Sequence, residues 1–209
     1  MRPRHYDKTP VAASATSIAA LQTLAAAGSL SLDGTYGASG FDWFAYRVTL
    51  TSANNLSGVT FTIAYEDADG IARTATTAGP NATTLSTSIY AKRVTSISTD
   101  GAAAAVSVGN GFAAYGPWKV LPFRSGYQAS GVSVTVTGTA NAGIEFTYAN
   151  VADLSIISGS FDAFDHPSLQ SITSSAYGSL DERVAGVRLK VNSYTSGSVR
   201  YDLAVAAVG

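Results

Sequence analysis

GVTFTIAYEDADGIARTAT (residues 58–76) and GVSVTVTGTANAGIEFTYA (residues 131–149) follow one pattern, which decides the fold prediction. Each begins with Gly-Val, continues with alternating apolar and polar residues, and reaches a polar stretch that ends at Gly70 or Gly143. Such alternation is typical of half-buried β-strands, and Asp-Gly is a preferred tight-turn dipeptide. Both segments are therefore predicted to be β-hairpins, and their likeness predicts two related β modules in series.

Period-two segments and turn signals continue along the chain. Residues 46–51 alternate in the same way, and the apolar stretches 184–191 and 199–208 flank a polar turn. Strands at this spacing indicate a sandwich or a barrel. The predicted fold is all-β, with two tandem β-sandwich modules of the jelly-roll or immunoglobulin-like type at residues 29–116 and 117–209.

The remaining residues, 1–28, are predicted to form an extended N-terminal arm. Pro3 and Pro10 favour an extended backbone at the start of the chain. A frayed terminus is the alternative, because the ends of domains are often poorly ordered. If the arm docks on a neighbouring subunit, its basic residues are expected to make the contacts: Arg2, Arg4 and Lys8.

Two stretches depart from the strand pattern. Residues 14–27 are rich in Ala and Leu, which is compatible with a short helix that ends at Gly28 or with an extended segment across a sheet. Residues 110–125 contain Gly116 and Pro117, which interrupt the alternation. We therefore predict the boundary between the modules at this second stretch.

The composition favours a surface that is covered by other subunits. Of the 209 residues, 46% are hydrophobic and 13% are charged, with a net charge of −1. Globular chains average about 25% charged residues, so few groups here keep neighbouring molecules apart. A homo-oligomer is expected, although a secreted β protein would have a similar composition. Without a basic field or a long apolar segment, we expect no direct nucleic-acid partner and no membrane span.

Patterns for catalysis or metal binding are few. The chain has no cysteine, which excludes disulfides and thiolate chemistry. His166 could act as a base or a metal ligand, but turn hydrogen bonds beside Pro167 are favoured. Residues 66–70 resemble the start of a calcium loop, but Ala78 stands where the final acidic ligand belongs. We expect no enzyme activity, no cofactor and no metal.

Aromatic residues suggest two kinds of contact. Trp118 lies in a cluster of aromatic and basic residues that is expected to form a packed joint between the modules and to contribute to partner binding. Exposed aromatic rings also stack on sugars, which makes a carbohydrate-binding module an alternative; the candidates are Trp43, Tyr46 and Trp118.

Six stretches covering most of the chain carry a family resemblance. They are VAASATSIAALQTLAAAGSLSLDG (11–34), RVTLTSANNLSGVTFTIAYEDADG (47–70), AGPNATTLSTSIYAKRVTSIS (78–98), VSVTVTGTANAGIEFTYANV (132–151), FDHPSL (164–169) and VAGVRLKVNSYTSGSV (184–199). Together they resemble a family of tailed-bacteriophage virion structural proteins. The last three are similar to a recurring C-terminal module of these proteins.

The resemblance implies a non-enzymatic virion protein that is present in several copies and assembled in the host cytoplasm. The first expectation is a capsid decoration or cement protein whose partners are the major capsid protein or neighbouring virion proteins. The alternatives are a tail, collar or baseplate component, or a carbohydrate-binding module for host adhesion.

Overall fold

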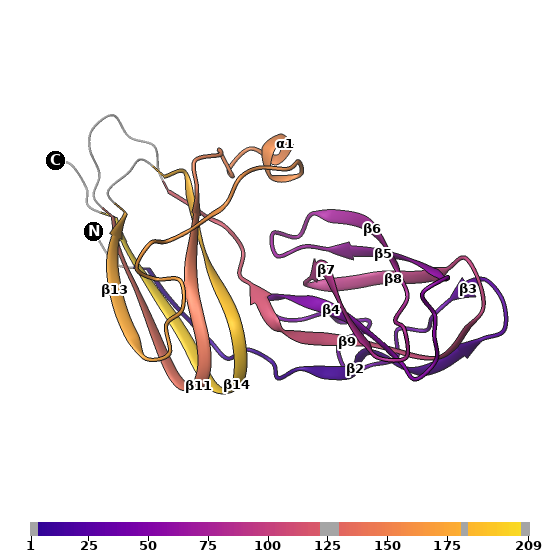
Figure 1. Cartoon of the computed structure of the whole chain (residues 1–209). Helices are drawn as coiled ribbons and strands as arrows, with labels where there is room; N and C mark the ends of the chain where they lie inside the picture. The colour runs from indigo at the N-terminus through magenta and orange to yellow at the C-terminus, as the bar shows by residue number, and fades with distance from the viewer. Residues whose placement is uncertain (1–3, 122–129, 181–183, 206–209) are drawn as a thin grey trace. The chain divides into compact units, whose positions relative to one another are not determined.

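The protein is all-β, as predicted. The computed structural model describes residues 4–121, 130–180 and 184–205 (Figure 1). Strands make up 62% of the structure, and the sheets are antiparallel. Backbone contacts divide the chain into two compact units. We call Ala12–Ala114 the insert unit, and Met1–Val11 together with Tyr115–Gly209 the split unit.

This division differs from the predicted one, because residues 4–8 and 14–24 form strands of the two units instead of a separate arm. Strand β1 (Arg4–Lys8) pairs with β14 (Gly186–Val205) of the split unit. Strand β2 (Ser14–Leu24) pairs with β9 (Ala103–Tyr115). The helix considered for residues 14–27 is wrong and the extended alternative is right, because pairing with β9 outweighs the helix propensity of the alanines.

The insert unit has two antiparallel sheets, which Figure 1 shows as two layers. In the first sheet, β2 lies beside β9, followed by β4 (Ala45–Ser52) and β7 (Thr84–Ala91). The second has the order β3 (Gly28–Ser29), β8 (Arg93–Thr99), β5 (Thr60–Glu66) and β6 (Ala72–Ala78). Alternate residues of both sheets are fully buried and form the core, among them Val48, Leu50, Phe61, Ile63, Ile97 and Val106.

Two long strands organise the split unit. Strand β11 (Ser130–Thr147) pairs with β14 along its whole length. Strands β13 (Ser175–Leu180) and β12 (Phe164–Asp165) pair with the first and second halves of β11. On the other side, β1 and β10 (Lys119–Val120) pair with the two halves of β14. The segment between β11 and β12 contains the short helix α1 (Leu154–Ile157).

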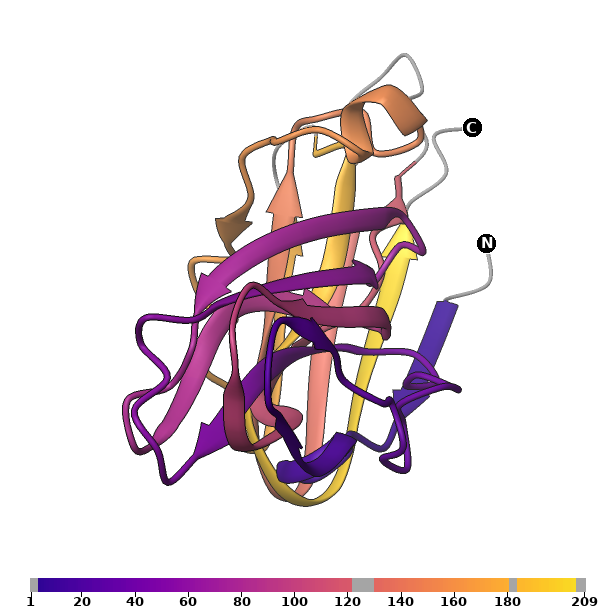
Figure 2. The same ribbon diagram turned by 90° about the vertical axis from the view of Figure 1, so that its right-hand side faces the viewer.

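Both long strands bend back at their middle, so that their halves form two layers (Figures 1 and 2). The bend lies at Gly138 and Gly197, which are register partners with φ angles of 80° and 96°. Positive φ angles of this kind favour glycine. Register shifts follow directly after Gly138. Side chains from both halves are fully buried, including Val134 and Tyr201 from one half and Ile144 and Leu189 from the other.

Only one of the two hairpin predictions is confirmed. Residues 58–76 contain β5 and β6, which pair antiparallel around the Asp67–Gly70 turn. Residues 131–149 are not a hairpin, because both halves of β11 pair with β14 instead of with each other. Gly143 is needed for a close approach: a Cβ atom there would lie 2.6 Å from the Gln170 carbonyl oxygen. The two segments are therefore not repeats of one structural unit.

Candidate interaction surfaces

The N-terminal basic residues lie on a strand that is bound to its own chain. Arg4 and Lys8 occupy the ends of β1, opposite Leu203 and Val199 of β14. The Tyr6 ring stacks on Tyr201 with centroids 4.8 Å apart. Arg2 lies outside the described residues. A partner that binds Arg4 or Lys8 would therefore contact the edge of a sheet.

Side-chain hydrogen bonds link the same strand to its neighbours. The His5 Nδ1 atom lies 2.6 Å from Asp202 Oδ1, and Ser133 donates a hydrogen bond of 3.2 Å to Asp202 Oδ2. Three adjacent strands, β1, β14 and β11, are linked by these contacts on one face of the sheet. The face carries alternating charges and hydroxyl groups, which suits a hydrated surface.

Trp118 is packed inside the split unit. Its side chain is 7% exposed, and the Arg188 guanidinium lies 4.4 Å from its ring and 4.0 Å from the Tyr115 ring. The Phe161 ring packs against Trp118 with centroids 5.7 Å apart. Because these contacts bury the indole, its ring is not offered to a sugar or a partner by the single chain.

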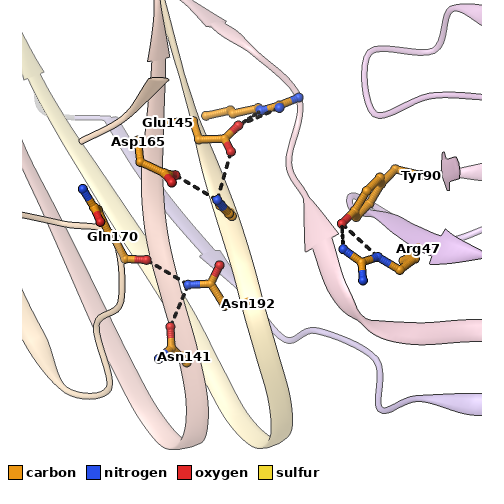
Figure 3. Close-up of polar contacts among 9 residues, drawn as sticks. Arg47, Tyr90, Asn141, Glu145, Asp165, Gln170 and Asn192 are labelled. Carbon is orange, nitrogen blue, oxygen red and sulfur yellow. Dashed lines mark hydrogen bonds and ion pairs between the residues drawn. The ribbon is translucent and has the colours of Figure 1, made fainter. Parts of the chain in front are cut away.

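Arg188 also begins a chain of charged contacts, in which Figure 3 labels Glu145 and Asp165. Arg188 donates two hydrogen bonds to Glu145 Oε2, at 2.8 and 2.6 Å. The Lys190 ammonium lies 3.2 Å from Glu145 Oε1 and 2.8 Å from Asp165 Oδ1. Burial disfavours the charged Lys190, but the hydrogen bond to Asp165 and the charge of Glu145 outweigh burial and raise the pKa of Lys190. The network joins β11, β14 and β12.

Below this network, amide groups fix the segment that covers β11. Asn192 donates to the Asn141 side-chain oxygen at 2.7 Å and to the Gln170 carbonyl at 2.8 Å (Figure 3). Asn141 donates to the Ser171 hydroxyl at 2.6 Å. These bonds hold the backbone of residues 169–171 against β11, at the place where Gly143 leaves room for it.

His166 has a structural environment. The Ser168 N–H donates to Nδ1 at 3.2 Å, which places the ring proton on Nε2. Nε2 lies 3.1 Å from the Ser179 carbonyl oxygen and donates to it. The neutral ring thus joins the segment after β12 to β13. Within the described residues, the ring nitrogens form hydrogen bonds to Ser168 and Ser179.

The Asp67 carboxylate organises the turn between β5 and β6. Its Oδ1 atom accepts hydrogen bonds of 3.0 Å from the N–H groups of Asp69 and Ile71. Its Oδ2 atom accepts one from Arg73. Both oxygens are therefore used by the turn itself. Among the residues that the structure describes, no group of three or more His, Asp or Glu side chains is suited to hold a metal ion.

The exposed aromatic residues are not the ones expected for sugar stacking. Tyr46 is 2% exposed and belongs to the core, and Trp43 is half-buried. The rings at the surface belong instead to Tyr148 and Phe164, 46% and 44% exposed, and to Phe112 and Tyr177. No pattern in the sequence indicates this difference, because the exposure of a ring depends on which other segments pack against its strand.

Tyr148 and Phe164 form a cluster with Phe146. The three ring centroids lie 5.7 to 5.8 Å apart, and Phe164 pairs with Phe146 across β11 and β12. Asp165, the partner of Lys190, directly follows Phe164. Because successive side chains of a strand point to opposite faces, the rings lie on one face and the Asp165 carboxylate on the other.

Comparisons with known proteins found no similar protein. No family model, no curated protein and no solved structure matches the chain. Within the part of the chain that the structure describes, no helix has the length and apolar character needed to cross a membrane.

Proposed function

We propose that the chain is a non-enzymatic structural protein of a bacteriophage virion, and in the first place a capsid decoration or cement protein. The resemblance of its sequence to tailed-phage virion proteins motivates the virion assignment. One observation supports a structural role: the polar groups that could have served chemistry, in Asp67 and His166, bond within the chain, whereas aromatic rings remain at the surface. Tyrosine and phenylalanine are enriched in protein interfaces.

The finer fold assignment is part of this proposal. The two layers of the insert unit support a β-sandwich of the jelly-roll or immunoglobulin-like type. In the split unit, the bend at Gly138 and Gly197 folds one antiparallel sheet into two layers, which supports a second sandwich module. Two β-sandwich modules, one inserted in the chain of the other, suit a protein with a mechanical role.

The mechanism would be the multiplication of weak contacts by symmetry. Each copy, assembled in the host cytoplasm, would bind the major capsid protein or neighbouring virion proteins through its strand edges and its exposed rings. A contact that is weak in one copy becomes strong when a lattice repeats it. Arg4 and Lys8, at the ends of the edge strand β1, are the charged residues that we assign to these contacts.

Quantitative mass spectrometry of purified particles tests the proposal. A decoration protein should occur once per major capsid protein or in a simple fraction of that number. A few copies per particle would favour the alternative of a tail, collar or baseplate component. Absence of the chain from particles would refute the virion proposal.

A carbohydrate-binding host-adhesion module remains a second candidate, supported now by Tyr148 and Phe164. Both rings are nearly half exposed and pack against each other with centroids 5.8 Å apart, which offers an apolar surface for stacking on a sugar ring. A glycan array should then show saturable binding that a Tyr148→Ala, Phe164→Ala double variant abolishes. Equal binding by both proteins would exclude this surface.

A further inference from the structure

The edge strand β13 carries the most exposed aromatic ring among the exposed large hydrophobic residues of the described chain. Tyr177, at its centre, is 88% exposed. The strand pairs with β11 in unbroken register from Ser175 to Leu180, and β11 is its only strand partner among the described residues. Figure 1 shows β13 at the margin of the split unit. Its other side is therefore a sheet edge.

Hydrogen bonds show which backbone groups point to this edge. The Val136 N–H donates to the Ser174 carbonyl, which makes positions 174, 176 and 178 the ones that bond to β11. In an antiparallel ladder the intervening residues, Ser175, Tyr177 and Ser179, point their N–H and C=O groups away. The His166 side chain bonds the Ser179 carbonyl from outside the ladder, in agreement with this assignment.

The other edges of the split unit are protected against pairing with another chain. Strand β1 carries Arg4, His5, Asp7 and Lys8, and charged residues block edge-to-edge association. Strands β10 and β12 have only two residues each. In contrast, β13 has six residues, SAYGSL, without a charge, a proline or a bulge. Apart from the His166 contact with the Ser179 carbonyl, the described residues show none of the common forms of edge protection on β13.

The sequence of β13 fits a second copy of itself. The sequence Ser-Ala-Tyr-Gly-Ser is nearly symmetric about Tyr177. A small residue lies next to the tyrosine on each side, and a serine lies two residues away on each side. Antiparallel pairing about a twofold axis through Tyr177 would place Ser175 opposite Ser179 and the tyrosine opposite its equivalent. Since no residue here is charged, the pairing brings no like charges together, and aromatic pairs stabilise cross-strand contacts.

We propose that two copies of the chain associate through their β13 edges, antiparallel and in register at Tyr177. The outward N–H and C=O groups of Tyr177 then bond to those of its equivalent, and the two small sheets become one continuous sheet. The inference deepens the proposed function, on which it rests for a multi-copy assembly, because it names the surface through which copies meet.

Cysteine cross-linking of the purified, full-length chain tests the register. The chain contains no cysteine, so Tyr177→Cys introduces a single thiol. Directly opposite residues have Cα atoms about 5.5 Å apart, within disulfide range. We expect mild oxidation to convert most of this variant to a covalent dimer. The matched control is Ser175→Cys: the two Cys residues would lie about 13 Å apart, four residues along the strand, so this variant should associate but form no disulfide cross-link.

A proline variant tests the edge without a cross-link. Tyr177→Pro removes an N–H group that points away from β11, so the fold tolerates it as edge strands tolerate proline. Sedimentation should show a dimer for the natural chain and at least a tenfold weaker association for the variant. A natural chain that stays monomeric at high concentration, or equal cross-linking through Cys at 175 and 177, would overturn the proposal. The copy number in virions is measured separately by mass spectrometry. The virion proposal and the β13 dimer proposal can therefore fail independently.

Discussion

Residues 58–76 and 131–149 share one sequence pattern but form different structures. The first is a hairpin in which β5 pairs with β6, and the second is one bent strand, β11, that pairs with β14. In the hairpin, the turn is made by its own residues: the Asp67 carboxylate accepts two N–H groups, and Gly70 has a φ angle of 81°. In β11, the bend needs Gly197 of another strand opposite Gly138.

The difference shows what decides between a turn and a bend. Alternating residues produce strands in both segments, but a hairpin forms where local side chains close the turn. Where they do not, the strand is paired by whichever partner offers a matching register. Strand β14 offers β11 such a partner along its whole length. Local hydrogen bonds and long-range pairing thus compete. Substitutions in the turn or in the bent strand can weaken one without the other.

Substitution of Gly197 should break the bent strand. A Cβ atom there would lie 1.8 Å from the Thr137 carbonyl oxygen, at a φ angle of 96° that alanine avoids. We expect Gly197→Ala to destabilise the split unit by about 3–5 kcal/mol, because backbone strain and overpacking add. The matched control is Gly70→Ala, where the φ angle is 81° but a Cβ atom meets nothing within 4 Å. Its cost should be about 1–2 kcal/mol.

The two tryptophans allow each unit to be followed by itself. Trp43 lies in the insert unit and Trp118 in the split unit, and the chain has no third tryptophan. Denaturant titration in a Trp43→Phe background therefore reports the split unit through Trp118. A Trp118→Phe background reports the insert unit through Trp43 in the same way. If Gly197→Ala shifted only the Trp43 transition, the assignment of the bend to the split unit would be wrong.

Loss of Glu145 should weaken the pairing of β11 with β14 by a smaller amount. Its carboxylate joins Arg188 and Lys190, and its side chain is mostly buried. We expect Glu145→Gln to cost about 2 kcal/mol, because the two cations are partly exposed and a neutral amide keeps one acceptor. The fluorescence transition of Trp118 measures this loss. An unchanged midpoint would show that the network contributes nothing to the strand pair.

Loss of Asp67 should affect the hairpin alone. Asp67→Ala leaves the N–H groups of Asp69 and Ile71 without their acceptor in a half-buried turn. We expect a cost of about 1–2 kcal/mol in the insert unit, reported by Trp43 in a Trp118→Phe background. Asp67→Asn, which keeps the Oδ1 acceptor for both N–H groups, is the control. Equal costs for both variants would mean that loss of this acceptor is not the cause.

Features that depend on local residues could be predicted from the sequence, and features that depend on long-range pairing could not. The β5–β6 hairpin was predictable, because Asp67 and Gly70 lie within the segment that they close. The bend was not, because Gly138 has a role only when Gly197 is known to face it. Among surface residues, Trp118 was assigned to partner contacts but is buried by Arg188. Tyr177 was missed, since its exposure depends on β13 having no second strand beside it in the described structure.

The smallest effect concerns two exposed carboxylates, one in each unit. Asp100 accepts the Thr60 N–H at 2.7 Å, and Asp153 accepts the Ser155 N–H at 2.9 Å and its hydroxyl. Hydrogen bonding from Thr60 lowers the pKa of Asp100, and hydrogen bonding from Ser155 lowers the pKa of Asp153. A lowered folded-state pKa adds stability that is present above the unfolded pKa of about 3.9 and is lost as the pH falls through the folded value.

Carbon-13 NMR titration of both carboxyl groups tests this pair. Both should titrate below the unfolded value, and Asp100→Asn or Asp153→Asn should reduce the acid sensitivity of its own unit only. If the pKa values of both carboxyl groups are lowered, local hydrogen bonds stabilise both units. The difference between the hairpin and the bent strand is then due to long-range pairing. If Asp153 titrates normally while Asp100 does not, the local hydrogen bonds at Asp153 are weaker than those at Asp100, and the two units differ in local closure as well as in long-range pairing.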